Sequence, residues 1–227
     1  DGGNIECIDS SDPSRVQLAI RSDHQSEFYQ WFYFRAANVR DLDCRYLINN
    51  ASGAAYQGGW QDYRAVASYD REVWFRVDTT FDGQNLVIEH NSSEDQVYFA
   101  YFAPFSMKRH ADLIAFAQSS ERCQAEALGL TLDGQTLDCL RFGEPDPQRR
   151  TLWMVARQHP GETMAEWWME GMVNRLVDHT DPVVSAMLDK AVIYLVPNMN
   201  PDGSRRGHLR TNAVGANLNR EWDKASP

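Results

Sequence analysis

The chain has 227 residues, a formal net charge of −10 and 43% hydrophobic residues, which is enough for one large domain or two smaller ones with a packed core. The acidic balance argues against a nucleic-acid partner, because affinity for phosphates comes mainly from Lys and Arg. No apolar run approaches the ~20 residues of a membrane-spanning helix, so no membrane span is expected. The four cysteines lack Cys-x-x-Cys spacing, and we interpret them as reduced core thiols of a cytoplasmic protein.

The first hundred residues have the pattern of short β-strands. Aromatic and β-branched runs at 27–39, 44–51, 73–90 and 95–104 are separated by turn residues. Such spacing is typical of an antiparallel sandwich or barrel. We predict a β-sandwich domain over residues 1–103. Its aromatic residues are more simply explained as core than as a carbohydrate-binding face.

The pattern changes after residue 103. A helix is predicted over 106–120, with Ser106 as its N-cap, followed by a hairpin around Asp133-Gly134. Three more elements are predicted after the hairpin: a buried-type strand at 151–156, a helix at 162–177 and a second buried strand at 191–197. A strand, a crossover helix and a second strand imply parallel pairing. We therefore predict an α/β domain over 104–227 with a mixed, mainly parallel sheet.

A histidine and a glutamate follow the first of these buried strands. His159 and Glu162 are separated by a Pro-Gly turn, and Glu162 is expected in the first turn of the next helix. Ligands collect at the carboxyl ends of parallel strands, and an imidazole with a carboxylate can bind zinc. A lone His-x-x-Glu is common, however, and Glu162 could simply favour a helix N-terminus. His208 is the one plausible local third ligand.

A second polar group follows the next strand. Arg210 and the dipeptide Asn219-Arg220 lie in a long polar connection beyond residue 197. A guanidinium binds a carboxylate through two parallel hydrogen bonds, and an asparagine amide can add a donor to the same anion. A metal site, a separate arginine and an Asn-Arg pair together suit a substrate that ends in a free carboxylate.

These motifs resemble those of a known enzyme family. "HPGET" at His159, "NPDG" at Asn200, Arg210 and "NLNREW" at Asn217 occur in the order found in zinc metallocarboxypeptidases of the carboxypeptidase A superfamily. The sequence is most similar to the cytosolic carboxypeptidase subfamily, including the junction between a β-sandwich and the catalytic domain. The resemblance covers most of the chain and implies Zn²⁺ as cofactor and a peptide or protein C-terminus as substrate.

The resemblance also implies roles for individual residues. His159 and Glu162 would be zinc ligands, and Arg210 would polarise the scissile carbonyl and stabilise the oxyanion. Asn219, Arg220 and Arg210 would bind the substrate. The implied reaction is zinc-dependent hydrolysis of C-terminal amino acids, in which zinc lowers the pKa of its bound water.

Two groups of the family's pattern cannot be located in the sequence. The third zinc ligand is a histidine downstream of the Asn-Arg pair, and the general acid/base is a later glutamate, whereas the sequence stops at Pro227. We therefore expect the 227 residues to be the front part of a longer enzyme, cut within its catalytic domain. We expect this polypeptide alone to bind zinc poorly and to be inactive, because a catalytic zinc takes three protein ligands.

Two other functions remain open at the sequence level. One is an amidohydrolase of N-acyl amino acids, whose relatives share a His-x-x-Glu pair and an Asn-Arg dipeptide. The other is a non-catalytic module that binds peptide C-termini through Arg210 and Asn219-Arg220 and needs no metal. The NPDG turn and the predicted sandwich favour the carboxypeptidase over the amidohydrolase.

Overall fold

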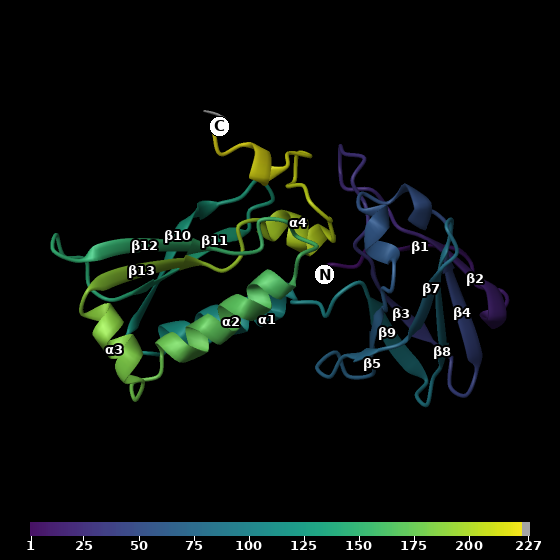
Figure 1. Ribbon diagram of the computed structural model, residues 1–227, viewed down its shortest axis with the longest axis horizontal. Coiled ribbons are helices and arrows are strands. Elements are labelled where there is room, and N and C mark those ends of the chain that lie inside the picture. The colour runs from purple at the N-terminus through teal and green to yellow at the C-terminus, as the bar shows by residue number, and fades with distance from the viewer. Residues whose placement is uncertain (224–227) are drawn as a thin grey trace.

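The computed structural model describes residues 1–223 and contains two halves, each with its own β-sheet structure (Figure 1). Residues 224–227, at the end of the predicted second domain, lie outside the described residues. The two-domain architecture is confirmed, with a first half of mostly antiparallel sheets and a second half of α/β type. The exact boundary between 1–103 and 104–227 stays a prediction. No helix in residues 1–223 is long and apolar enough to cross a membrane.

The first half consists of two sheets that pack on one hydrophobic core. Its strands are β1 (Glu6–Asp9), β2 (Val16–Ala19), β4 (Asp43–Ile48), β8 (Leu86–Asn91) and β7 (Asp78–Phe81) in one sheet, and β3 (Tyr33–Ala37), β9 (Gln96–Ala100), β5 (Val66–Ser68) and β6 (Phe75–Arg76) in the other. Strands β2 and β4 run parallel, and the other neighbouring pairs described here are antiparallel. Short 3₁₀ turns lie at Pro13–Arg15, Ala51–Gly53 and Gln57–Trp60.

The aromatic run at 27–39 forms less strand than its composition predicts. Only Tyr33–Ala37 pairs as a strand, and the residues before it are irregular. Trp31 and Phe32 are nevertheless buried, and they belong to the core cluster that both sheets cover. Their aromatic side chains are therefore core, as the sequence indicates, and the turn at Asp82 joins β7 and β8 as predicted.

The second half is a mixed four-stranded sheet with helices against it. The strands β10 (Cys123–Leu130), β11 (Thr136–Phe142), β13 (Ala191–Val196) and β12 (Arg150–Val155) lie side by side in that order. The helices are α1 (Met107–Gln118), α2 (Met164–Leu176), α3 (Pro182–Leu188) and α4 (Pro201–Arg206). Helices α1 and α2 lie along one face of the sheet, and α4 lies between the sheet and the first half (Figure 1).

Most predicted elements of this half are confirmed. Ser106 caps α1 by accepting a hydrogen bond from the Arg109 amide, and β10 and β11 form the predicted hairpin. Strands β12 and β13 pair in parallel through α2 and α3, as the strand–helix–strand pattern requires. In the described sheet this is one parallel pair beside two antiparallel ones, so parallel pairing does not predominate there.

Three local features differ from the sequence prediction. Helix α4 occupies the stretch expected as a loop, because Asn200 caps it and Pro201 starts it. Strand β12 was expected to be buried, yet most of its residues are exposed, since in residues 1–223 it lies at the end of the sheet. Of the four cysteines, none of which is in a disulfide, Cys7 is exposed rather than in the core.

Candidate active site

The turn after β12 carries the predicted metal-binding pair. His159 and Glu162 lie in a tight turn in which the Glu162 amide donates to the His159 carbonyl at 3.1 Å. Glu162 therefore precedes α2, which begins at Met164 after the N-cap Thr163, and is not in its first turn as expected. The turn holds the two side chains on the same side, and His159 Nδ1 lies 3.0 Å from Glu162 Oε1.

The buried side chain of Arg157 holds this turn in place through hydrogen bonds. Its φ of 43° is in the left-handed region, which is uncommon for a residue with a side chain. The buried guanidinium donates to the Pro160 carbonyl at 3.0 Å, to the Phe105 carbonyl at 2.6 Å and to Glu166 Oε2 at 2.7 Å. These bonds tie the turn to the start of α1 and to α2, so the backbone around His159 is fixed from three directions.

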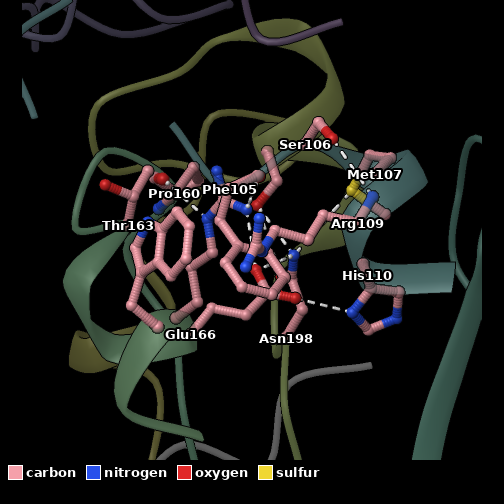
Figure 2. A network of polar contacts seen from close by, with 12 residues as sticks. Phe105, Ser106, Met107, Arg109, His110, Pro160, Thr163, Glu166 and Asn198 are labelled. Atoms are coloured by element: carbon pink, nitrogen blue, oxygen red, sulfur yellow. Dashed lines mark hydrogen bonds and ion pairs between the residues drawn. The ribbon is translucent and has the colours of Figure 1, made fainter. Parts of the chain in front are cut away.

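Glu166 is the centre of a buried polar network (Figure 2). Besides Arg157, it contacts His110 Nδ1 at 2.6 Å and accepts a hydrogen bond from Asn198 Nδ2 at 3.3 Å. The other imidazole nitrogen of His110 lies 3.0 Å from Asp138 Oδ2. Burial lowers the pKa of His110, but the hydrogen bonds and charges of Asp138 and Glu166 outweigh it and raise the pKa to about 9. Burial also lowers the pKa of Arg157.

The structure brings Arg210 to the His159–Glu162 pair. The Arg210 guanidinium lies 3.4 Å from His159 Nε2 and 4.0 Å from Glu162 Oε1. Asn217 Oδ1 lies 3.1 Å from the same His159 nitrogen. The imidazole is nearly buried, whereas the Glu162 side chain is half exposed at 49%. Arg210, 51 positions from His159, therefore meets the two neighbouring predicted residues His159 and Glu162 at one point.

The Asn219-Arg220 pair lies close to this point but makes fewer contacts. Both residues are exposed, and the Arg220 guanidinium donates to the Asn219 carbonyl at 3.0 Å. Arg220 lines the same cleft as Glu162 and Arg210. The backbone N–H of Asn219 donates to Asn217 Oδ1 at 3.2 Å. No described contact directs the Asn219 side chain to the cleft.

A cleft of about 650 Å³ opens above these residues, between the two halves of the chain. The second half contributes the polar groups Glu162, Arg210 and Arg220, with Met164 and Leu209. The first half contributes the polar side chain of Gln30 and the apolar or aromatic side chains of Phe28, Ala55, Tyr56, Tyr101 and Phe102. The charged groups of the cleft thus come from the second half, whereas the wall from the first half is mostly aromatic.

His208 is excluded as a local third ligand. It is buried, its Nδ1 donates to the Thr211 carbonyl at 3.0 Å, and its Nε2 accepts from the His24 amide at 3.2 Å. Both ring nitrogens are therefore engaged away from His159. Nowhere in residues 1–223 do three or more His, Cys, Asp or Glu side chains form a group that could hold a metal ion.

The His159–Glu162 pair itself suits zinc chemically. Two ligands about 2.1 Å from a tetrahedral zinc lie about 3.4 Å apart, close to the observed separation of 3.0 Å. A neutral imidazole and a carboxylate are both common zinc ligands. The pair therefore fits one edge of such a site.

Comparison with known proteins decides the family. Residues 1–102 match the cytosolic carboxypeptidase N-terminal domain, and residues 110–226 match the zinc carboxypeptidase family. The chain belongs to the zinc carboxypeptidase family.

One related sequence and two solved structures illustrate the relationship. An uncharacterized protein of Zymomonas mobilis is 51% identical over 98% of this chain and 57% of its own length. A solved structure from Shewanella denitrificans is 53% identical with a TM-score of 0.97, covering 100% of this chain and 60% of that one. A metallo-carboxypeptidase from Pseudomonas aeruginosa, solved with (2-guanidinoethylmercapto)succinic acid, is 44% identical with a TM-score of 0.95, again covering 100% and 60%. The chain thus spans somewhat more than half the length of these proteins.

Several residues that build this candidate site were not predicted from the sequence. The sequence marks Asn217 only as the start of the NLNREW motif, and Asn198 only as the first residue after the second buried strand. Arg157 lies two residues before His159. It gives no signal of its own, because a buried arginine cannot be told from an exposed one in the sequence. Its burial depends on Glu166, which helical spacing places on the inner face of α2.

Proposed function

We propose that the protein containing this chain is a zinc-dependent carboxypeptidase that hydrolyses the last amino acid from peptides or proteins. The observation that carries the proposal is the approach of the Arg210 guanidinium to within 4.0 Å of Glu162 and 3.4 Å of His159, in a cleft that Arg220 also lines. A cationic donor next to a histidine–carboxylate pair suits hydrolysis of a bond close to a free carboxylate.

His159 and Glu162 would hold the zinc. When bound, the metal polarises a carbonyl and supplies a water of lowered pKa. Arg210 would donate to the carbonyl oxygen as negative charge develops there, a contribution of about 3–4 kcal/mol for one donor. Arg220 and Asn219 would bind the substrate's terminal carboxylate, with Arg210 as a further substrate contact. Asn217 would hold the His159 ring in its orientation.

The ligand of the Pseudomonas aeruginosa relative supports this type of substrate. That compound has two carboxylates and a guanidino group, and the related protein is described as a metallo-carboxypeptidase. In this chain, two separate arginines could each pair with a carboxylate of such a molecule. The match to the cytosolic carboxypeptidase N-terminal domain supports a cytoplasmic location for the protein.

The test uses the purified full-length protein and a pair of matched peptides, one with a free C-terminal carboxylate and one with that carboxylate amidated. We expect release of the last residue from the free peptide only, loss of turnover after zinc is chelated, and recovery when zinc is restored. Arg210→Ala should lower kcat/KM by about 10²–10³-fold, while the zinc content stays unchanged.

Three outcomes would contradict the proposal. Faster turnover of an N-acyl amino acid than of the free peptide would favour the amidohydrolase. Binding of the free peptide by a metal-free protein, without hydrolysis, would favour a non-catalytic module. Equal cleavage of the free and amidated peptides would rule out recognition of the terminal carboxylate.

A further inference from the structure

The loop that carries Arg210 is held by a carboxylate from the other half of the chain. Asp23, which is 3% exposed, accepts hydrogen bonds from the amides of Leu209 at 2.6 Å, Arg210 at 2.8 Å and Thr211 at 2.9 Å. The Thr211 hydroxyl donates to the same carboxylate at 3.1 Å. Four donors from three consecutive residues thus converge on one side chain 187 positions away from Arg210.

Asp23 is itself fixed to the first half of the chain. Its amide donates to the Phe28 carbonyl at 2.8 Å, and its carbonyl accepts from the Ser26 amide at 3.2 Å. The neighbouring His24 amide donates to His208 Nε2 at 3.2 Å. The Phe28 ring faces the Arg210 guanidinium, with its centre 5.7 Å from Arg210 Cζ. The segment 23–28 therefore contacts both the backbone and the side chain at position 210.

The hydrogen bonds between the Asp23 carboxylate and residues 209–211 restrict this loop more than apolar packing alone would. A buried carboxylate is costly unless donors satisfy it, and hydrogen bonds to an ionised acceptor are about twice as strong as neutral ones. Three successive amides that point at one anion leave the backbone of 209–211 little freedom. The Arg210 side chain starts from this backbone, so its distance from His159 and Glu162 depends on Asp23.

We propose that Asp23 is a positioning residue for Arg210, and that the N-terminal half of the chain thereby forms part of the active site. The inference rests on the proposed function of Arg210. Asp23 does not touch the reacting atoms; it fixes the loop from which the guanidinium reaches them. A displacement of about 1 Å at such a group can cost about 10²-fold in rate.

The main test is Asp23→Asn in the full-length enzyme. The amide nitrogen of asparagine would face backbone N–H groups, donor against donor, so the loop should move. We expect kcat to fall by about 10²-fold, with a smaller change in KM and with normal zinc content, because the main role of Arg210 is in the transition state and its substrate contact is one of several. In an Arg210→Ala background, Asp23→Asn should cause almost no further loss, since its effect passes through Arg210.

A matched control comes from another contact between the halves. Glu72 of the first half pairs with Arg109 of α1 at 3.1 Å, and none of the described hydrogen bonds of this pair involves residues 209–211. Glu72→Gln removes this ion pair and should leave kcat, KM and zinc content unchanged. A general weakening of the contact between the halves would affect both variants.

Amide hydrogen exchange gives a readout that does not depend on activity. The amides of residues 209–211 should exchange faster in Asp23→Asn than in the wild type, whereas Glu72→Gln should leave them unchanged. Should Asp23→Asn melt below the assay temperature, Thr211→Val is compared instead. It removes one of the four donors, so a few-fold loss of kcat that disappears in the Arg210→Ala background is expected.

Specific results would overturn the inference. They are unchanged kcat in the Asp23 or Thr211 variant, or an equal fold-loss with and without Arg210, which would indicate a general structural role. Failure of the proposed function looks different: the wild-type protein would then release no amino acid, while faster exchange at 209–211 in Asp23→Asn would still be observed.

Discussion

His110 is a buried residue whose charge supports the site without contacting it. Its imidazole lies between Glu166 at 2.6 Å and Asp138 at 3.0 Å, and Glu166 in turn pairs with Arg157, which fixes the His159 turn. With both nitrogens facing carboxylates, the protonated ring satisfies both as a donor. The raised pKa of His110, about 9 against 6.5, expresses this preference.

A pH dependence of stability follows from that pKa. Because the pKa in the folded state lies above the ordinary value, the stabilisation is fully present below about pH 6.5 and is lost as the pH rises through about 9. We expect the free energy of unfolding to fall by up to about 3 kcal/mol across this range. Urea denaturation at a series of pH values measures it. His110→Gln, which cannot titrate, should remove most of the slope; an unchanged slope would contradict this role for His110.

Residues in the motifs that follow β12 and β13 could be assigned to the site from the sequence, whereas residues of the first half could not. His159 and Glu162 are three positions apart, and a tight turn is enough to aim them together. Asp23 contacts the Arg210 loop only because the two halves pack as they do, and no local pattern marks it. His208 looked like a ligand in the sequence, yet its nitrogens bind the backbone of residues 24 and 211.

At the scale of elements, helix α4 packs closely on the turn and the loop that carry the site. Gly203 in this helix has no room for a side chain, since a Cβ there would lie 2.4 Å from Pro160 Cγ and 2.6 Å from the Thr211 carbonyl oxygen. Asn200 caps the helix by accepting from the Gly203 amide at 3.0 Å. The helix is therefore the element against which the His159 turn and the Arg210 loop are both set.

Two glycine substitutions separate this packing from helix propensity. Gly203→Ala should destabilise the protein by about 1–3 kcal/mol, because the backbone of Thr211 cannot yield without shifting the loop. Gly171→Ala in α2 meets nothing within 4 Å and should stabilise it by up to about 1 kcal/mol. Thermal unfolding of the two variants measures both signs. A Gly203→Ala protein as stable as Gly171→Ala would show that the close approach is unimportant.

Elements with strong local signals were predictable, and those set by their surroundings were not. The Ser106 cap and the hairpin turn at Asp133-Gly134 identified α1 and the β10–β11 pair. Strand β12 has a continuous apolar sequence, but its exposure depends on its place at the end of the described sheet. The short α4 was missed, because Pro201 and Gly203 look more like a turn than a helix.

At the scale of the whole molecule, the cleft belongs to both halves. The sandwich side supplies an aromatic wall and the α/β side supplies Glu162, Arg210 and Arg220. Leu209, next to Arg210, packs into the hydrophobic core of the first half. The order of elements predicted two domains, but it could not predict that the first would reach into the site of the second, because that depends on how the halves pack.

His159 and Glu162 are expected to share one zinc ion beside Arg210. The most direct test is anomalous X-ray scattering at the zinc absorption edge from a crystal of the full-length protein grown with zinc. We predict a peak on the Nδ1 side of His159, about 2.0–2.2 Å from that nitrogen and from a Glu162 carboxylate oxygen. Zinc bound elsewhere, with no peak at this pair, would contradict the account.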